Sequence, residues 1–159
     1  METKENVKKL CSFCVSDIHF GTMILPYISK KIEQRNNIYT IFEKDMYNNI
    51  EKVISNLNLN KETKEEIKKV EWDKKTQTKD IRNYIRNLKQ NSGIVLVRGN
   101  KKFIDKTNKK IEKQVKRKGL EDVTIINFYN VDVFNQNMGE ILKSHNGILN
   151  TLGESKIEV

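Results

Sequence analysis

Short apolar runs alternate along this chain with stretches whose apolar residues recur at helical spacing. Six runs have the length and the β-branched or aromatic content typical of strands. They are 10–15, 36–42, 69–72, 93–97, 123–129 and 155–159. The run 93–97 is apolar throughout, which is typical of a strand covered on both faces in the middle of a parallel sheet. We expect the tail 155–159 at an edge of the sheet.

The stretches between these runs predict helices. In 22–34, Ile24, Ile28 and Ile32 form one stripe, and Pro26 would fall in the first turns, where its missing N–H costs least. The other expected helices are 46–57 after a capping Asp45, 60–69, one from Thr78 or Asp80 to Leu88, 101–118 before Gly119, and 133–145. Strands joined by helices form right-handed βαβ units. We therefore predict an α/β three-layer sandwich of the RecA or Rossmann kind, with a mostly parallel sheet of about five or six strands.

The length of 159 residues fits one domain, 1–159, and we expect 1–8 to be a flexible N-terminal segment. No apolar run approaches the ~20 residues that a membrane span needs. The first six residues are charged and polar, unlike a signal peptide. These observations predict a cytoplasmic protein that does not contact membranes.

The formal net charge is +9, from 30 Lys and Arg residues against 21 Asp and Glu residues. Such a charge suggests nucleic acid as a partner. However, only five of the basic residues are arginine, the residue that reads guanine bidentately, while Lys and Asn are abundant throughout. We therefore favour the interpretation that the charge is compositional.

The predicted helix 101–118 is rich in lysine, so the same two interpretations, nucleic-acid binding or a compositional origin, apply to it. Its lysines either contact phosphates or keep an outer helix soluble, and no aromatic residues alternate with them for base stacking. We favour the second interpretation and keep nucleic-acid binding as the alternative. The residues that would serve it are Lys106, Lys109, Lys110, Lys113, Lys116 and Arg117.

The two cysteines form a Cys11-x-x-Cys14 motif inside a predicted strand. Side chains alternate along a strand, so the two thiols should face opposite sides of the sheet. A structural zinc site needs four ligands, and the chain has no second cysteine pair, while His19 and His145 are far apart in sequence. We therefore expect buried structural cysteines, no metal site and no cofactor.

The loop after the first strand lacks the features of a phosphate-binding loop. Residues 16–21 contain one glycine, Gly21, and no lysine before a serine or threonine. A phosphate loop needs glycines so that its backbone can approach the anion, and a lysine beside Ser or Thr. This composition argues for sensing or scaffolding over nucleotide hydrolysis.

In parallel α/β sheets, ligands bind beyond the carboxyl ends of the strands. The polar residues that follow the predicted strands are therefore the candidate ligand-binding residues: Ser16, Asp17, His19, Glu43, Arg98, Asn100, Tyr129 and Asn130. Structural roles compete with this one, because Arg98 could pair with a carboxylate and Tyr129 could lie half-buried with its hydroxyl in water. No nucleophile, base and orienting group form a compelling set, so we assign no catalytic residue.

Three stretches together are similar to one known family. They are Cys11–Phe42 with its Leu25-Pro-Tyr-Ile28 step, Gly93–Gly99, and Thr124–Asn130 followed by a helix that ends in Leu142-x-x-His145. These stretches resemble the MEDS domain, a sensory domain named for methanogens, methylotrophs and the dichloromethane repressor. The resemblance covers 10–149. It departs from the family at the start of the first strand, where Lys9 to Cys11 stand in place of a histidine, and at Asn130 in place of a carboxylate.

The resemblance implies a RecA-like fold without a working nucleotide site, used to sense small molecules for an output module. No helix-turn-helix or kinase segment is visible, so a stand-alone copy would signal through a regulatory protein partner or by self-association. Our leading hypothesis is a non-enzymatic sensory or regulatory domain that binds a small molecule at the strand ends. The alternatives are a nucleic-acid-associated protein that uses helix 101–118, and a small hydrolase or nucleotide-dependent enzyme with a non-standard site centred on Asp17 and His19.

Overall fold

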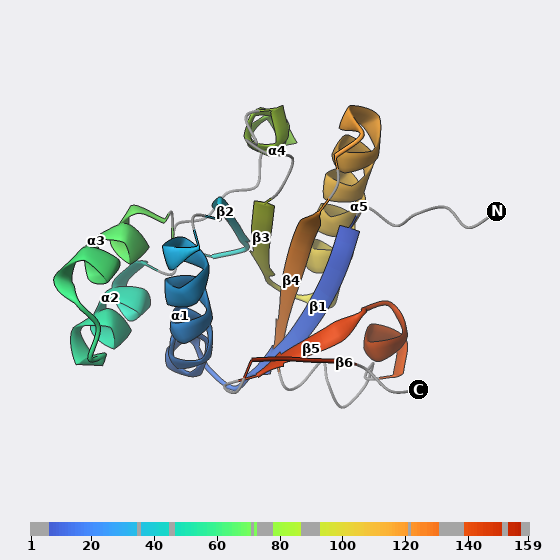
Figure 1. Ribbon diagram of the computed structural model, residues 1–159. Helices are drawn as coiled ribbons and strands as arrows, with labels where there is room; N and C mark the ends of the chain where they lie inside the picture. The colour runs from blue at the N-terminus through green and yellow to red at the C-terminus, as the bar shows by residue number, and fades with distance from the viewer. Residues whose placement is uncertain are drawn as a thin grey trace.

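The protein is an α/β sandwich built on one six-stranded sheet (Figure 1). A computed structural model describes residues 7–34, 36–44, 47–70, 72, 78–86, 93–120, 122–130, 139–150 and 153–156. The strand order is β2-β3-β4-β1-β5-β6. All pairings are parallel except that of β6, which runs antiparallel to β5. The predicted fold class, a mostly parallel sheet between layers of helices, is confirmed.

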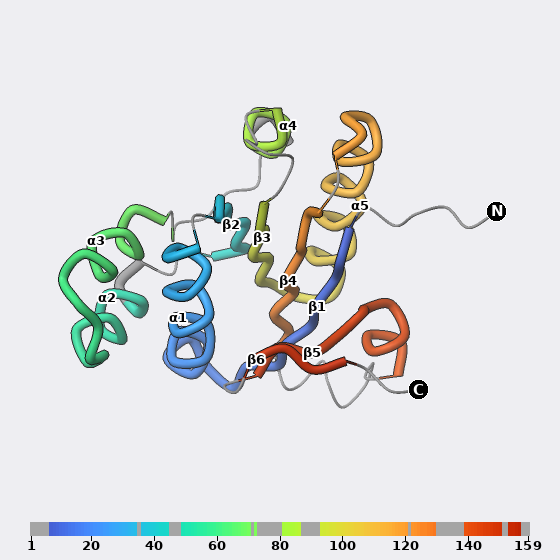
Figure 2. Tube along the Cα trace, viewed as in Figure 1, coloured from blue at the N-terminus to red at the C-terminus, as the bar shows by residue number. Residues whose placement is uncertain are grey.

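The strands are β1 (Val7–Cys14), β2 (Ile38–Phe42), β3 (Gly93–Arg98), β4 (Val123–Asn130), β5 (Gly147–Asn150) and β6 (Gly153–Lys156). The helices are α1 (Asp17–Glu33), α2 (Tyr47–Asn56), α3 (Lys61–Lys69), α4 (Thr78–Arg86) and α5 (Lys101–Lys118). A further helical segment, 139–143, precedes β5. Figures 1 and 2 show α1, α2 and α3 together on one side of the sheet, and α5 on the other.

Two hydrophobic clusters fill the space between these layers. The first joins α1, α2 and α3 to one face of the sheet, and the second joins α4, α5 and 139–143 to the other. Cys14 belongs to the first cluster and Cys11 to the second, as the strand alternation predicts. Both are buried free thiols, and burial raises the pKa of Cys11 to about 11 and that of Cys14 to about 12. Neither therefore forms a reactive thiolate near neutral pH.

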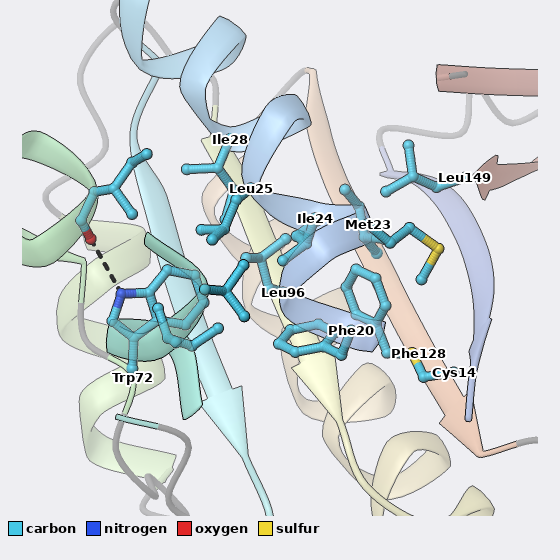
Figure 3. Packing of buried hydrophobic residues seen from close by; sticks show 14 of the residues in the cluster. Cys14, Phe20, Met23, Ile24, Leu25, Ile28, Trp72, Leu96, Phe128 and Leu149 are labelled. Carbon is cyan, nitrogen blue, oxygen red and sulfur yellow. Dashed lines mark hydrogen bonds between the residues drawn. The ribbon is translucent and has the colours of Figure 1, made fainter. Parts of the chain in front are cut away.

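The first cluster is organised by aromatic side chains (Figure 3). Phe20 of α1 packs edge-on against both Phe42 and Phe128, with ring centroids 5.9 and 4.7 Å apart. The ring of Trp72 stacks on Phe42, and its indole N–H donates to the carbonyl of Ile67 at 3.0 Å. Edge-on and offset ring pairs add to the stabilisation from burial, and the hydrogen bond of the indole offsets the cost of burying its N–H.

The strand order creates a switch in direction between β1 and β4. The chain leaves β1 on the α1 face, whereas it leaves β4 towards segment 139–143, which packs on the opposite face. Connections that diverge in this way open a crevice at the carboxyl ends of the two strands, where α/β proteins bind ligands. The fold thus places the predicted ligand-binding edge at the ends of β1, β3 and β4.

Four predictions about individual elements are wrong or incomplete. Segment 69–72 is not a strand in its described residues, because Lys69 completes α3 and Val70 caps it. Helix α1 begins five residues earlier than predicted, so Pro26 lies in its interior and the carbonyl four residues before it loses its N–H partner. Residues 7 and 8 belong to β1 and not to a flexible N-terminal segment. No strand is predicted at 147–150, where β5 lies.

Candidate functional site

In the turn from β1 to α1, side chains form hydrogen bonds with the backbone of the turn itself. The hydroxyl of Ser16 caps α1 by accepting from the backbone N–H of His19 at 3.1 Å. His19 in turn accepts from the N–H of Val15 through Nδ1 at 3.0 Å. A Cβ on Gly21 would lie 3.1 Å from a methyl group of Val53, so this glycine allows α1 to pack closely on α2. Ser16, His19 and Gly21 therefore build the turn and its packing.

Asp17 and Arg98 form the main ion pair of the sheet edge. Their Oδ1 and Nη1 atoms are 2.7 Å apart, and the Arg98 side chain is only 8% exposed. The guanidinium also lies 4.8 Å from the centre of the Phe20 ring. The other carboxylate oxygen of Asp17 accepts from Asn49 at 2.9 Å and lies 3.6 Å from Lys44. The pair joins the end of β3 to the start of α1 across β4, which lies between β3 and β1 in the sheet.

Glu43 and Asn100 form a second contact at the same edge. Glu43 accepts from the backbone N–H of Asn100 at 3.0 Å and from its side-chain amide at 3.2 Å. Asn100 caps α5 by accepting from the N–H of Phe103 at 2.8 Å. The N–H of Glu43 donates to the carbonyl of Arg98 at 2.9 Å. The structure thus brings together four of the predicted residues, Asp17, Arg98, Glu43 and Asn100, through polar contacts.

The remaining predicted residues lie at the end of β4. Tyr129 is 2% exposed, so it is buried and not half-buried with a wet hydroxyl as expected. Its ring packs edge-on against His145, with centroids 5.9 Å apart, and burial, followed by the charge of Asp105, raises its pKa. Asn130 is the last residue of β4, and its side chain lies outside the described part of the structure.

A buried polar network lies on the α5 face of β4, and the sequence analysis did not identify it. The amides of Asn108 and Asn127 bond to each other in both directions, at 2.8 and 2.7 Å. The Nδ2 atom of Asn127 also lies 2.9 Å from Nε2 of His145, whose Nδ1 lies 2.5 Å from the carbonyl of Ile141. An asparagine between Ile126 and Phe128, inside a predicted central strand, was the available signal, since a buried amide needs partners.

Helix α5 carries most of the net charge of the molecule. Its 18 residues hold nine Lys and Arg against two Asp and Glu, a contribution of +7 to the total of +9. The other 141 residues hold 21 basic and 19 acidic residues and are close to neutral. A purely compositional origin predicts charge spread evenly along the chain. The observed charge is instead concentrated on α5. A count of charge along the chain would have revealed this from the sequence.

The exposed side of α5 presents these charges in a row, which we name the α5 basic stripe. It consists of Lys106, Lys109, Lys113, Lys116 and Arg117, which are all exposed. The two acidic residues of the helix are engaged elsewhere: Asp105 with Lys101 at 2.8 Å and Glu112 with Lys9 at 3.0 Å. Within the described residues, no carboxylate forms an ion pair with a member of the stripe. Lys110 is partly buried beside it.

Comparison with protein-family models, with curated proteins and with solved structures finds no match for this chain. The resemblance to the MEDS domain therefore stays a prediction. Among the described residues, no group of three or more His, Cys, Asp or Glu side chains could hold a metal ion. No helix in the same part of the chain is both long enough and apolar enough to cross a membrane.

Proposed function

We propose that this protein binds the phosphate backbone of a nucleic acid duplex through the α5 basic stripe. The observation that carries the proposal is the concentration of +7 on one helix of a molecule whose remainder is nearly neutral, with five of the cations exposed on one face of that helix. A row of cations displaces the counterions condensed on a duplex, and the release of those ions drives association.

The dimensions of the stripe support this kind of partner. From Lys106 to Lys116 the helix advances about 15 Å, since each residue adds ~1.5 Å. Over that length each strand of a duplex presents about four phosphates, at ~3.4 Å per charge along the axis. Four of the five members are lysines, which bind phosphate as point charges and lack the planar fork that reads bases. We therefore expect binding with little sequence preference.

The buried side of α5 favours a nucleic acid over a lipid surface. Ile104, Ile111 and Val115 are fully buried against the sheet, so the helix keeps no apolar face free to enter a bilayer. Helices that lie in a membrane interface need such a face.

The test is the salt dependence of binding to a fluorescent DNA duplex, measured by anisotropy. Neutralising four or five phosphates predicts a slope of about −4 for log K against log salt, or about 250-fold weaker binding at 200 mM than at 50 mM. Changing Lys106, Lys109, Lys113 and Lys116 together to Gln should remove most of this slope. The matched control changes Lys52, Lys61, Lys64 and Lys68 of α2 and α3 to Gln, which alters the net charge equally on the opposite layer.

Two results would refute the proposal. One is a loss of affinity in the α2 and α3 control variant as large as that in the α5 variant, since net charge alone would then explain binding. The other is no binding by the unchanged protein at 50 mM salt. Binding to vesicles of anionic lipid in the absence of DNA binding would point to a membrane partner instead.

A second function, sensing of a small molecule at the carboxyl edge of the sheet, is favoured by the Asp17–Arg98 pair. Removing charges from water is costly, so an ion pair with a buried guanidinium, at the edge where the two connections diverge, is a candidate for ligand recognition. A thermal-shift screen should then find a stabilising metabolite that is not a nucleotide, and Arg98→Ala should abolish the shift. Persistence of the shift in Arg98→Ala would exclude this edge. Co-expression and affinity capture would test for the regulatory partner.

A further inference from the structure

A cavity of about 420 Å³ lies between the second half of α1 and the hairpin of β5 and β6. It is on the α1 side of the sheet, away from the α5 basic stripe and from the Asp17–Arg98 pair. Its volume is in the range of small-molecule sites, about 300–1,000 Å³. Its apolar wall comes from Met23 and Pro26, and its polar wall from Tyr27, Lys30, Lys31 and Glu154.

The only carboxylate among the described lining residues is already neutralised by its neighbours. One oxygen of Glu154 accepts from the hydroxyl of Tyr27 at 3.0 Å, and the other lies 2.6 Å from Nζ of Lys8. Burial alone would raise the pKa of Glu154, but the hydrogen bonds from Lys8 and Tyr27 outweigh it and hold the pKa below its ordinary value. Glu154 is therefore ionised and fully engaged, and it braces the hairpin against α1.

The two lysines leave this wall with an excess of positive charge. Nζ of Lys31 lies 5.3 Å from the centre of the Tyr27 ring, which places its charge beside the cavity. Lys30 precedes it in the last turns of α1 and is exposed. Neither lysine forms an ion pair with a carboxylate in the part of the chain that the structure describes. The charge of Lys31 also helps to lower the pKa of Glu154, but the ion pair of Glu154 is with Lys8, so neither Lys30 nor Lys31 is held in a direct contact with it.

We propose that this cavity binds a small organic acid with an apolar body. The anionic group would lie at Lys30 and Lys31, and the apolar body would cover Met23 and Pro26. Binding sites of this kind combine a mostly apolar surface with a few polar groups that fix orientation. A carboxylate or a phosphate monoester could supply the anion, since lysine pairs with either as a point charge.

The test is titration of the isotope-labelled protein with benzoate and phenyl phosphate, followed by amide chemical shifts, with neutral benzamide as the comparison. We expect saturable shifts of α1, β5 and β6 amides with both anions, and at least tenfold weaker binding of benzamide. The double variant Lys30→Gln/Lys31→Gln should weaken the anions at least tenfold and leave benzamide unchanged. Lys52→Gln/Lys61→Gln, which removes two exposed lysines elsewhere, is the matched control and should bind like the unchanged protein.

Three outcomes would overturn the proposal: equal binding of benzamide and benzoate, no effect of the Lys30/Lys31 change, or shifts that map outside α1, β5 and β6. Stronger binding of one anion identifies its head group as the preferred one. DNA binding uses another face and another assay, so failure here leaves the α5 proposal standing, and the reverse also holds.

Discussion

At the scale of single residues, the buried network around His145 determines which protonation state the fold accepts. Nδ1 faces the carbonyl of Ile141, so it carries the proton, and Nε2 accepts from the amide of Asn127. Asn127 cannot freely reverse its amide, because both of its polar atoms also bond to Asn108. A second proton on Nε2 would face an N–H group. The folded protein therefore favours the neutral ring.

This arrangement predicts loss of stability on mild acidification. Burial lowers the pKa of His145 below its ordinary value of 6.5. The carbonyl of Ile141 and the charges of Asp105 and Glu112 oppose that shift, while Lys9 adds to it. The unfolded chain then binds more protons than the folded one as pH falls below 6.5, so the free energy of unfolding should decrease by up to about 1.4 kcal/mol per pH unit. Above that pH, His145 contributes no dependence.

Urea unfolding between about pH 5 and pH 7.5 measures this effect, because carboxylates titrate mainly below that window. The His19→Gln background leaves His145 as the only histidine. Adding His145→Gln should flatten the pH dependence whatever its effect on stability at pH 7.5. Equal slopes with and without His145 would show that the network does not discriminate between the protonation states.

At the scale of elements, Asn100 has a structural role as the N-cap of α5, and this role can be tested separately from ligand binding. Its side chain accepts from the N–H of Phe103 and donates to Glu43. Replacing an asparagine N-cap by alanine costs ~1 kcal/mol. We expect this loss for Asn100→Ala in chemical unfolding, and a similar loss for Asn60→Ala, which removes the cap of α3. Unchanged stability in Asn100→Ala alone would show that its role as a cap is dispensable.

The strands also show which elements can be predicted from local sequence patterns. The strands at 93–98 and 123–130 were predictable because their apolar runs are long and β-branched. The four-residue strand β5 was not, because it is short and its apolar residues directly follow a helical pattern. The prediction of a strand at 69–72 was wrong because Val70 and Trp72 are apolar for another reason: they join the hydrophobic cluster on the α1 side of the sheet, where Trp72 stacks on Phe42 of β2.

At the scale of the whole molecule, the location of the site depended on topology. Asp17, Glu43, Arg98 and Asn100 were predictable as residues that follow strands, and the fold class then placed them at one edge. Their pairing was not predictable: the Asp17–Arg98 pair depends on β4 lying between β1 and β3, and the Glu43–Asn100 contact depends on β2 lying beside β3. The cavity beside Tyr27 was hidden for the same reason, since it needs β5 and β6 to return beside α1. By contrast, the charge of α5 could be counted from the sequence without knowledge of the fold.

The C-terminal hairpin of β5 and β6 provides a test of whether the edge of the sheet can unfold locally while the central strands stay folded. Gly147 of β5 is packed so closely that a Cβ would lie 2.7 Å from the carbonyl oxygen of Ser155 and 2.9 Å from a methyl group of Leu10. Gly147→Ala must therefore displace β6 or β5, and overpacking of this kind costs about 1–3 kcal/mol. Because β5 pairs with β1 at just two positions, with further bonds through Cys11, Ser12 and the Lys9–Asn146 contact among the described residues, we expect the disturbance to stay local.

Native-state hydrogen exchange measures the result strand by strand. In Gly147→Ala, the amides of β5 and β6 should exchange at least tenfold faster, while those in the centre of β3 and β4 keep their relative protection. Gly139→Ala is the matched control, because a Cβ there meets nothing within 4 Å. Uniform loss of protection across the sheet would contradict a locally held hairpin, and it would tie the cavity beside α1 to the stability of the entire fold. Local loss would mean that the hairpin can open by itself, which would give a ligand a route into that cavity.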